Sequence, residues 1–114
     1  MKIYLYRRTF FTGIGEAIGI FELEAEEKDK TYKIARGQGA LCSVTVRKDS
    51  LDQINSLFYG RDMFSLSNDK LEHYRNLLIE RENETIEQYK KHISSHEKEI
   101  EKIKVLDVVK SLEF

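Results

Sequence analysis

The chain has 114 residues, of which 34% are charged, and its formal net charge is −1 at pH 7. This length predicts one domain, 1–114, and the balanced charge excludes a general attraction to nucleic acid or to an anionic membrane. The apolar runs are shorter than the roughly 18–20 residues that cross a bilayer, and the first residues lack the apolar segment of a signal peptide. We therefore expect a cytoplasmic protein with neither a membrane nor a nucleic acid as its partner.

Residues 1–66 have the alternating pattern of an antiparallel β-sheet of about four or five strands. The connections between the alternating stretches are too short for crossover helices. Ile3 and Leu5 point to one face of the first stretch and Tyr4 and Tyr6 to the other, so we expect this strand to be central or covered on both sides. The expected strands are 2–11, 17–25, 31–36 and 40–48.

Residues 67–104 carry the signal of a single long helix, with no Pro or Gly between Asn68 and Lys104. About 37 residues at about 1.5 Å each give a rod of roughly 55 Å, longer than a small domain of about 30 Å. Apolar residues recur along it, and from Ile86 onward they follow a heptad pattern typical of coiled coils. We expect this face to need a partner, either a second copy of the chain or a different molecule. Of the two we favour a homo-oligomer, formed through Leu78, Ile86, Tyr89, Ile93, His96, Ile100 and Ile103.

Several details around this helix stay open. The spacing before Ile86 resembles a stutter, and a break into a helical hairpin near 82–85 is the alternative. Apolar spacing favours one or two helical turns within 49–60, and a short strand is expected at 61–66. Ser67 is then the expected N-cap, with Asp69 in the first turn. The apolar tail, 105–114, fits a last strand, a docked helix or a swapped arm equally well.

No motif in the chain predicts catalysis or metal binding. The Gly13–Gly15 segment lacks the third glycine and the following helix of a dinucleotide-binding loop, so we interpret it as a hairpin turn. His92 and His96 have a spacing that can bind zinc, but no third ligand is evident. Cys42 has no histidine near it in the sequence and is expected to be a buried strand residue. We expect no enzymatic activity, no cofactor and no metal.

One group of basic and aromatic residues has a clearer chemistry. Guanidinium groups hold phosphate bidentately and aromatic rings stack on bases, so these residues, if they converge, would bind a phosphorylated ligand that contains a base. Two other interpretations stay open. In one, the charged residues only solvate the sheet edge while the aromatic residues lie in the core, and in the other the group forms a protein-binding surface. The candidate ligand-binding residues are Arg7, Arg8, Arg47, Lys48, Tyr59, Arg61, Phe64 and Arg75.

The layout of the chain and two short motifs resemble small phage-encoded proteins of low-GC Gram-positive hosts. The motifs are Lys-Thr-Tyr-Lys-Ile at Lys30–Ile34 and Met-Phe-Ser-Leu-Ser at Met63–Ser67. In size and layout the chain is similar to Thoeris anti-defence sponge proteins, which bind a cyclic ADP-ribose-type signal and withhold it from a host defence effector. The resemblance implies a counter-defence binder acting in the host cytoplasm, and it assigns no binding residue to a position here.

Together these features predict an α+β fold, with an antiparallel sheet followed by one long helix or a helical hairpin. We expect a non-enzymatic phage-type protein that counteracts a host immune system by sequestering a nucleotide-derived second messenger, such as a cyclic nucleotide or a cyclic ADP-ribose-type ligand. One alternative is an inhibitor of a host defence protein, such as an anti-CRISPR protein. Its helix face and acidic residues would then occupy a basic nucleic-acid channel, the acidic residues being Glu22, Glu24, Glu26 and Glu27. Another is a structural protein whose helix only forms homo-oligomers.

Overall fold

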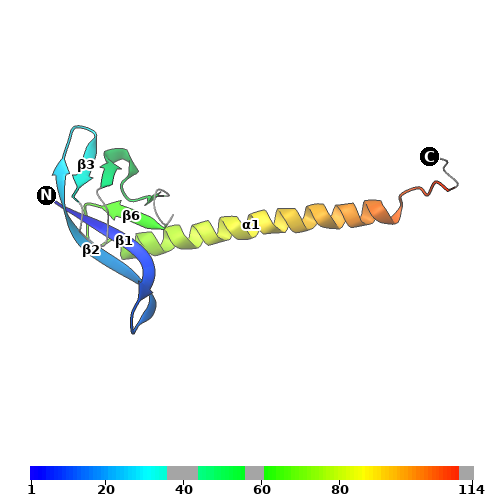
Figure 1. Cartoon of the computed structure of the whole chain (residues 1–114), viewed down its shortest axis with the longest axis horizontal. Helices are drawn as coiled ribbons and strands as arrows, with labels where there is room; N and C mark the ends of the chain where they lie inside the picture. The colour runs from blue at the N-terminus through cyan, green and yellow to red at the C-terminus, as the bar shows by residue number, and fades with distance from the viewer. Residues whose placement is uncertain (36–43, 56–60, 111–114) are drawn as a thin grey trace. The chain divides into compact units, whose positions relative to one another are not determined.

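The computed structural model describes residues 1–35, 44–55 and 61–110. These residues contain a six-stranded antiparallel sheet followed by one long helix, α1 (Leu71–Lys104), which confirms the α+β expectation (Figure 1). The sheet has the order β4-β3-β2-β1-β6-β5. Its strands are β1 (Lys2–Phe11), β2 (Gly15–Glu27), β3 (Thr31–Ile34), β4 (Val44–Arg47), β5 (Ile54–Asn55) and β6 (Asp62–Ser65).

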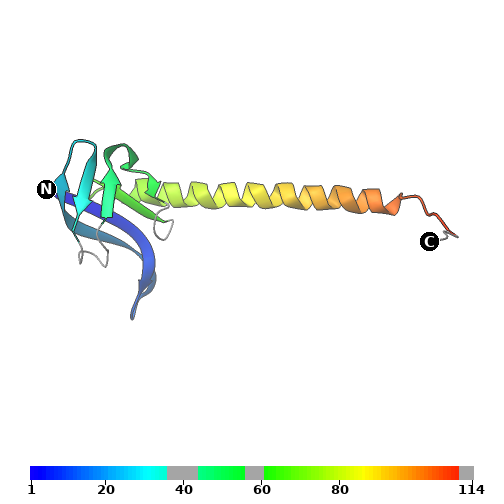
Figure 2. The ribbon, with the colours of Figure 1, turned by 45° about the horizontal axis from the view of Figure 1, so that its top comes forward.

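β1 and β2 form a long antiparallel hairpin. The register pairs Phe11 with Gly15 at the turn and Lys2 with Glu24 near the other end. Gly13 and Gly15 have φ angles of 84° and 94°, a region that glycine enters without steric cost. This segment is therefore a hairpin turn, as its sequence predicted. Figures 1 and 2 show that the hairpin bends along its length.

β1 lies between β2 and β6, and both of its faces are covered. Ile3 and Leu5 belong to the first buried cluster, which also contains side chains of β2, β3, β4 and β6. Tyr6 points to the other face and belongs to a second buried cluster with Met63 and Tyr74. Because alternate residues of a strand point to opposite faces, this arrangement confirms the expectation for β1.

One or two helical turns were expected within residues 49–60, and in the described part this expectation is wrong beyond Ser50. Lys48–Ser50 is a short 3-10 helix, and β5 pairs with β6; residues 56–60 lie outside the described part. Leu51 packs against the first buried cluster, whereas Ile54 packs against the second. The spacing of three between Leu51 and Ile54 therefore does not reflect a helix, because the two side chains pack on opposite faces of the sheet.

α1 is one continuous helix, so the alternative of a hairpin with a break near 82–85 is wrong. It begins at Leu71, four residues after the expected N-cap at Ser67. The later start has a physical cause in Tyr6, whose hydroxyl donates a hydrogen bond to the Ser67 carbonyl at 2.7 Å and accepts one from the Lys70 amide at 3.0 Å. These two bonds hold residues 67–70 as a non-helical link.

The chain divides into two units, Met1–Ile79 and Glu80–Phe114. The first unit contains the sheet and the start of α1, and the second contains the rest of α1. Every described residue of the second unit is exposed. Residues 106–110 are neither helix nor strand, so the expected strand or docked helix is absent from this part of the tail; residues 111–114 lie outside the described part.

Candidate binding site and association surface

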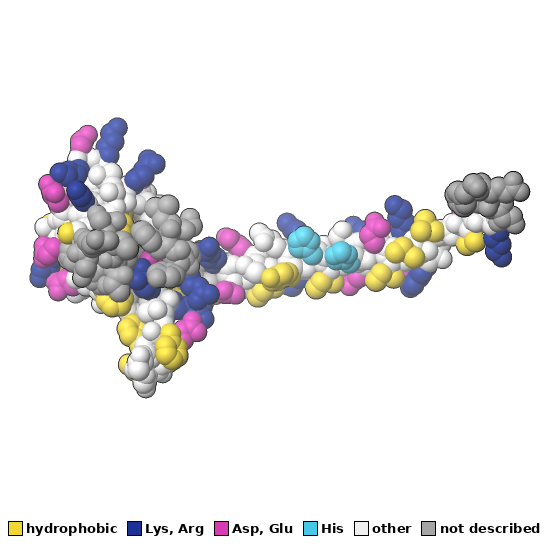
Figure 3. Space-filling model, in the orientation of Figure 1, with side chains coloured by type: hydrophobic (Ala, Val, Ile, Leu, Met, Phe, Trp, Pro, Cys, Tyr) yellow, Lys and Arg dark blue, Asp and Glu magenta, His cyan; other side chains and the backbone are white. Residues whose placement is uncertain are grey.

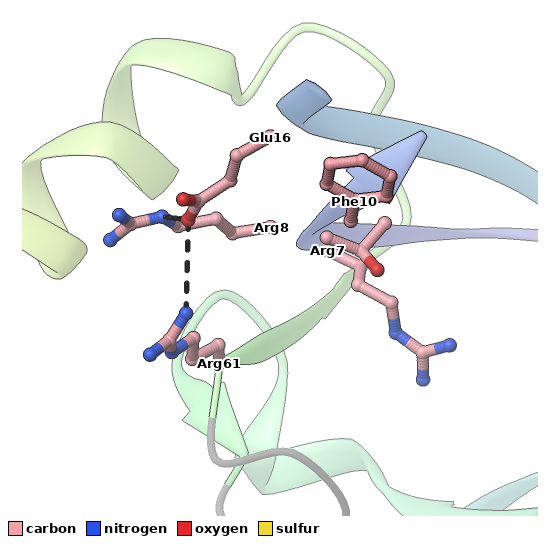
Figure 4. A pocket seen from close by; sticks show the side chains of 6 residues that line it. Arg7, Arg8, Phe10, Glu16 and Arg61 are labelled. Atoms are coloured by element: carbon pink, nitrogen blue, oxygen red, sulfur yellow. Dashed lines mark hydrogen bonds and ion pairs between the residues drawn. The ribbon is translucent and has the colours of Figure 1, made fainter. Parts of the chain in front are cut away.

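A hollow of about 450 Å³ lies beside the β1–β2 hairpin (Figure 4). The register of the hairpin builds it, because Phe10 lies directly opposite Glu16 and Arg8 lies two residues before Phe10 on the same face. Arg61, which directly precedes β6, contributes from the neighbouring strand. The lining residues are Arg7, Arg8, Thr9, Phe10, Glu16 and Arg61.

Two guanidinium groups meet one carboxylate at this hollow. Glu16 Oε1 accepts a hydrogen bond from Arg8 Nε and lies 3.9 Å from Arg61 Nη1 (Figure 4). The three side chains keep one positive charge in excess and are 37–52% exposed. Phe10 lines the same hollow and is 74% exposed. If Glu16 turns away, an anionic group with an adjacent flat ring could contact both guanidinium groups and the Phe10 ring.

Tyr74 fixes the backbone on two sides of this hollow. Its hydroxyl accepts a hydrogen bond from the Arg8 amide at 2.9 Å and donates one to the Arg61 carbonyl. Burial raises the pKa of the Tyr74 phenol, so the hydroxyl keeps the proton that it donates to Arg61. In the sequence Tyr74 has only the spacing of an apolar helix residue, and no local signal connects it with Arg8 or Arg61.

Arg7 lines the hollow, but its guanidinium pairs with Asp62 instead of with Glu16, and this corrects its predicted ligand role. Its side chain is only 7% exposed, and its Nε and Nη2 atoms donate to Asp62 Oδ1 and Oδ2 at 2.9 and 2.7 Å. The strand register places Arg7 directly opposite Asp62. Figure 4 shows the Arg7 guanidinium directed away from Glu16, Arg8 and Arg61. Its charge is neutralised inside the sheet and holds β1 to β6.

Phe64 and Arg75, two other predicted ligand residues, do not line this hollow. Phe64 is 1% exposed within the first buried cluster, so the prediction that it stacks on a ligand is wrong. Tyr59 lies outside the described residues. Arg75 borders a second hollow of about 430 Å³, which Arg8 and Glu16 also line, so this hollow adjoins the first.

Arg47 and Lys48 lie elsewhere on the sheet. They line a separate hollow of about 460 Å³ at the end of β4, and neither lines the hollow at Glu16. Arg47 pairs with Asp49 at 2.8 Å, and Lys48 lies 3.4 Å from a carboxylate oxygen of Glu27. The predicted basic cluster is therefore divided between separate places, and Arg8 and Arg61 share the carboxylate of Glu16.

The acidic residues of β2 take part in ion pairs. Glu22 lies 2.6 Å from Lys2, and Glu26 lies 2.7 Å from Lys28. The Lys28 partner lowers the pKa of the Glu26 carboxyl through a hydrogen bond and its charge. A surface that imitates nucleic acid needs an excess of negative charge, and this pairing reduces that excess at Glu22 and Glu26.

A second candidate surface is the association stripe of α1, which lies wholly in the second unit. Ile86, Ile93 and Ile100 recur every seven residues, and Ile103 follows three residues later. The apolar members of the stripe are 48–65% exposed, and Figure 3 shows apolar side chains along the helix. A period of seven residues drifts by only about 20° per heptad around a straight helix, so these side chains share one face. The association stripe consists of Ile86, Tyr89, Ile93, His96, Ile100 and Ile103.

Leu78 does not continue this face, which corrects its predicted place in the interface. It is partly buried and packs against the cluster of Tyr6, Met63 and Tyr74. The residue seven positions before Ile86 is Ile79, which is 57% exposed. The sequence contained this signal, because Ile79 stands in the same heptad position as Ile86.

No protein-family model, curated protein or solved structure matches this chain. Among the residues that the structure describes, no group of three or more His, Cys, Asp or Glu side chains could hold a metal ion. Within the same described part, no helix has the length and apolar character needed to cross a membrane.

Proposed function

We propose that this chain is a non-enzymatic binding protein that works as a homo-oligomer, with the association stripe as its contact surface. The observation that carries the proposal is the stripe itself, in which Ile86, Ile93 and Ile100 follow one another at heptad spacing and are all exposed. Isoleucine at successive first positions of the heptad is typical of coiled-coil interfaces.

The helix also gains stability from such a contact. Most helical stability in proteins comes from packing of an apolar face, and isolated helices are marginal in water. Every residue of 80–104 is exposed. A second chain on the stripe would supply the packing that this segment lacks.

Paired substitutions test the proposal in solution. Ile93→Asp places a charge in the stripe and is expected to reduce the mass measured by light scattering to that of one chain. Ser95→Asp adds the same charge two residues away, outside the stripe, and is expected to leave the mass unchanged. Equal masses for both variants and the parent protein would remove the stripe as the contact surface.

A second candidate function is capture of a phosphate-bearing ligand at the hollow beside the β1–β2 hairpin. It is supported by the two guanidinium groups of Arg8 and Arg61 and by the exposed ring of Phe10. The resemblance to sponge proteins narrows this candidate to the sequestration of a nucleotide-derived signal that a host defence uses. One oligomer would then carry several copies of the site.

Calorimetry with cyclic nucleotides and ADP-ribose cyclisation products tests this second candidate. We expect Glu16→Gln to tighten binding, because it removes the carboxylate that competes for both guanidinium groups. Arg61→Gln is expected to weaken binding, and Glu87→Gln on the exposed helix serves as the matched control. Absence of heat for the parent protein and for Glu16→Gln at micromolar concentrations would exclude the candidate.

The alternative of a protein-directed inhibitor stays a prediction. A stoichiometric complex with a defence protein in a host lysate would favour it. The ion pairs of Glu22 and Glu26 make an acidic imitation of nucleic acid the less favoured mechanism.

A further inference from the structure

We infer that the partner of the association stripe is a second copy of this chain that runs parallel and in register. The inference rests on the proposed homo-oligomer and adds the direction of the helices, which the sequence left undecided. In heptad notation, Ile86, Ile93 and Ile100 occupy the a positions. Tyr89, His96 and Ile103 then occupy the d positions.

The charges beside the stripe identify a second copy as a suitable partner. In a parallel pair, each g residue faces the e residue of the next heptad of its partner. This rule places Glu99 opposite Lys104 of the other copy, and His92 opposite Glu97. Neither pair is repulsive, and each occurs twice by symmetry.

These charges alone do not decide the direction. In the antiparallel alignment that keeps all three heptads, Ile86 faces Ile103 of the other copy, and Lys90 faces Glu97. Surface ion pairs of this kind contribute only about 0–1 kcal/mol each. The flanking charges therefore contribute about equally to the stability of the parallel and the antiparallel pair. The buried layers decide between the two directions.

The buried layers favour the parallel direction. In register, each isoleucine at an a position meets its own copy, and the two His96 rings meet each other. One imidazole can then donate a hydrogen bond to the other, because a neutral ring carries one donor and one acceptor nitrogen. In the antiparallel alignment, His96 faces Ile93 and Tyr89 faces Ile100, so each imidazole is buried against an aliphatic side chain. A buried polar group without a partner costs about 1–3 kcal/mol.

Ile79 and Glu82 occupy the a and d positions of the preceding heptad. Ile79 favours the parallel pair, whereas Glu82 disfavours it. A parallel pair can add an Ile79 layer, which the three-heptad antiparallel alignment leaves uncovered. It also places Glu82 beside its own copy, and like charges across an interface are unfavourable. We therefore expect Glu82→Gln to strengthen association of the parallel pair.

Disulfide formation at one position tests the direction. The variant Ile103→Cys is made together with Cys42→Ser, which removes the single native cysteine. In the parallel pair the two new cysteines share one layer, within the Cα separation of about 4.4–6.8 Å that a disulfide needs. In the antiparallel pair they lie about 26 Å apart, because 17 residues at about 1.5 Å separate positions 86 and 103. Lys98→Cys in the same background is the control, since its side chain points away from the stripe.

We expect the Ile103→Cys protein to form a disulfide-linked pair in a glutathione redox buffer, and the Lys98→Cys protein to stay unlinked. Sedimentation of the Cys42→Ser protein, which keeps Ile103 in the stripe, separates the two claims. An associated protein without the disulfide would overturn the parallel direction and leave the homo-oligomer standing. A single-chain mass would overturn the homo-oligomer itself. Equal linking at positions 98 and 103 would indicate random collision and would also overturn the inference.

Discussion

The hydroxyl of Tyr74, in the first turns of α1, accepts a hydrogen bond from the backbone amide of Arg8 in β1 at 2.9 Å. The same hydroxyl donates to the carbonyl of Arg61. One side chain of the helix thus connects the two residues whose guanidinium groups share Glu16. The geometry of the hollow therefore depends on a residue that does not line it.

Tyr74→Phe is expected to lower the free energy of unfolding by about 1–3 kcal/mol. The substitution removes this partner from the Arg8 amide and the Arg61 carbonyl, whose bonds to Tyr74 are partly buried. Polar groups left unsatisfied away from water cost about that much. Chemical denaturation measures the effect. Gln88→Glu, at an exposed helix residue outside the association stripe, is the control and should change stability by less than about 0.5 kcal/mol. An equal effect of the two substitutions would contradict the role assigned to Tyr74.

Stability should fall at alkaline pH. Burial raises the pKa of Tyr6 and of Tyr74 above the ordinary phenol value of about 10. The unfolded chain therefore loses these protons first as the pH rises, which favours unfolding above about pH 10 and leaves stability intact below it. Denaturation at a series of pH values between 8 and 11 tests this, and Tyr6→Phe should make the fall smaller. An identical decline in Tyr6→Phe and the parent protein would argue against these phenols as its source.

The ion pair between Arg7 and Asp62 is expected to be the most sensitive charge pair in the sheet. Asp62→Asn removes the carboxylate opposite a guanidinium whose side chain is only 7% exposed, and breaking a buried pair costs about 3–5 kcal/mol. Asp49→Asn breaks the exposed pair with Arg47, where about 0–1 kcal/mol is expected. The denaturation midpoints of the two variants, each compared with that of the parent protein, measure these losses of stability. Similar losses for both variants would mean that burial does not set the strength of these pairs.

Reversing the charge at position 99 or at position 104 should determine which variant chains pair with one another. Glu99→Lys and Lys104→Glu each place like charges across a parallel interface, so each protein should self-associate more weakly. A mixture of the two restores opposite charges at both contacts and should form mixed pairs, which native mass spectrometry can count. Lys104 lies 3.0 Å from Glu101 in its own chain, but exposed pairs of this kind contribute little. A random distribution of pairs in the mixture would contradict the expected contact between positions 99 and 104.

Local sequence patterns were sufficient for the β1–β2 hairpin and for the continuity and C-terminal end of α1. Strand alternation and the glycines at 13 and 15 are local signals, and so is the absence of Pro and Gly from the helix. The start of α1 was predicted less well. Ser67 has the chemistry of an N-cap, but Tyr6, which is distant in the sequence, binds the backbone at Ser67 and Lys70 and delays the helix to Leu71.

The candidate site could be predicted only in part. Arg8 and Arg61 were selected as basic residues, but the carboxylate that joins them belongs to Glu16, and only the hairpin register brings it there. Arg7 and Phe64 were selected for chemistry that burial removes from the surface. The sequence shows which charged and aromatic side chains are present. The pairing of the strands determines which of these side chains are exposed next to one another.

The mass of the parent protein in solution tests the central claim most directly. Sedimentation equilibrium over a range of concentrations should give a mass of at least two chains of 13.4 kDa, because a second copy is expected to cover the association stripe. A mass of one chain throughout the micromolar range, with α1 still helical by circular dichroism, would contradict the account.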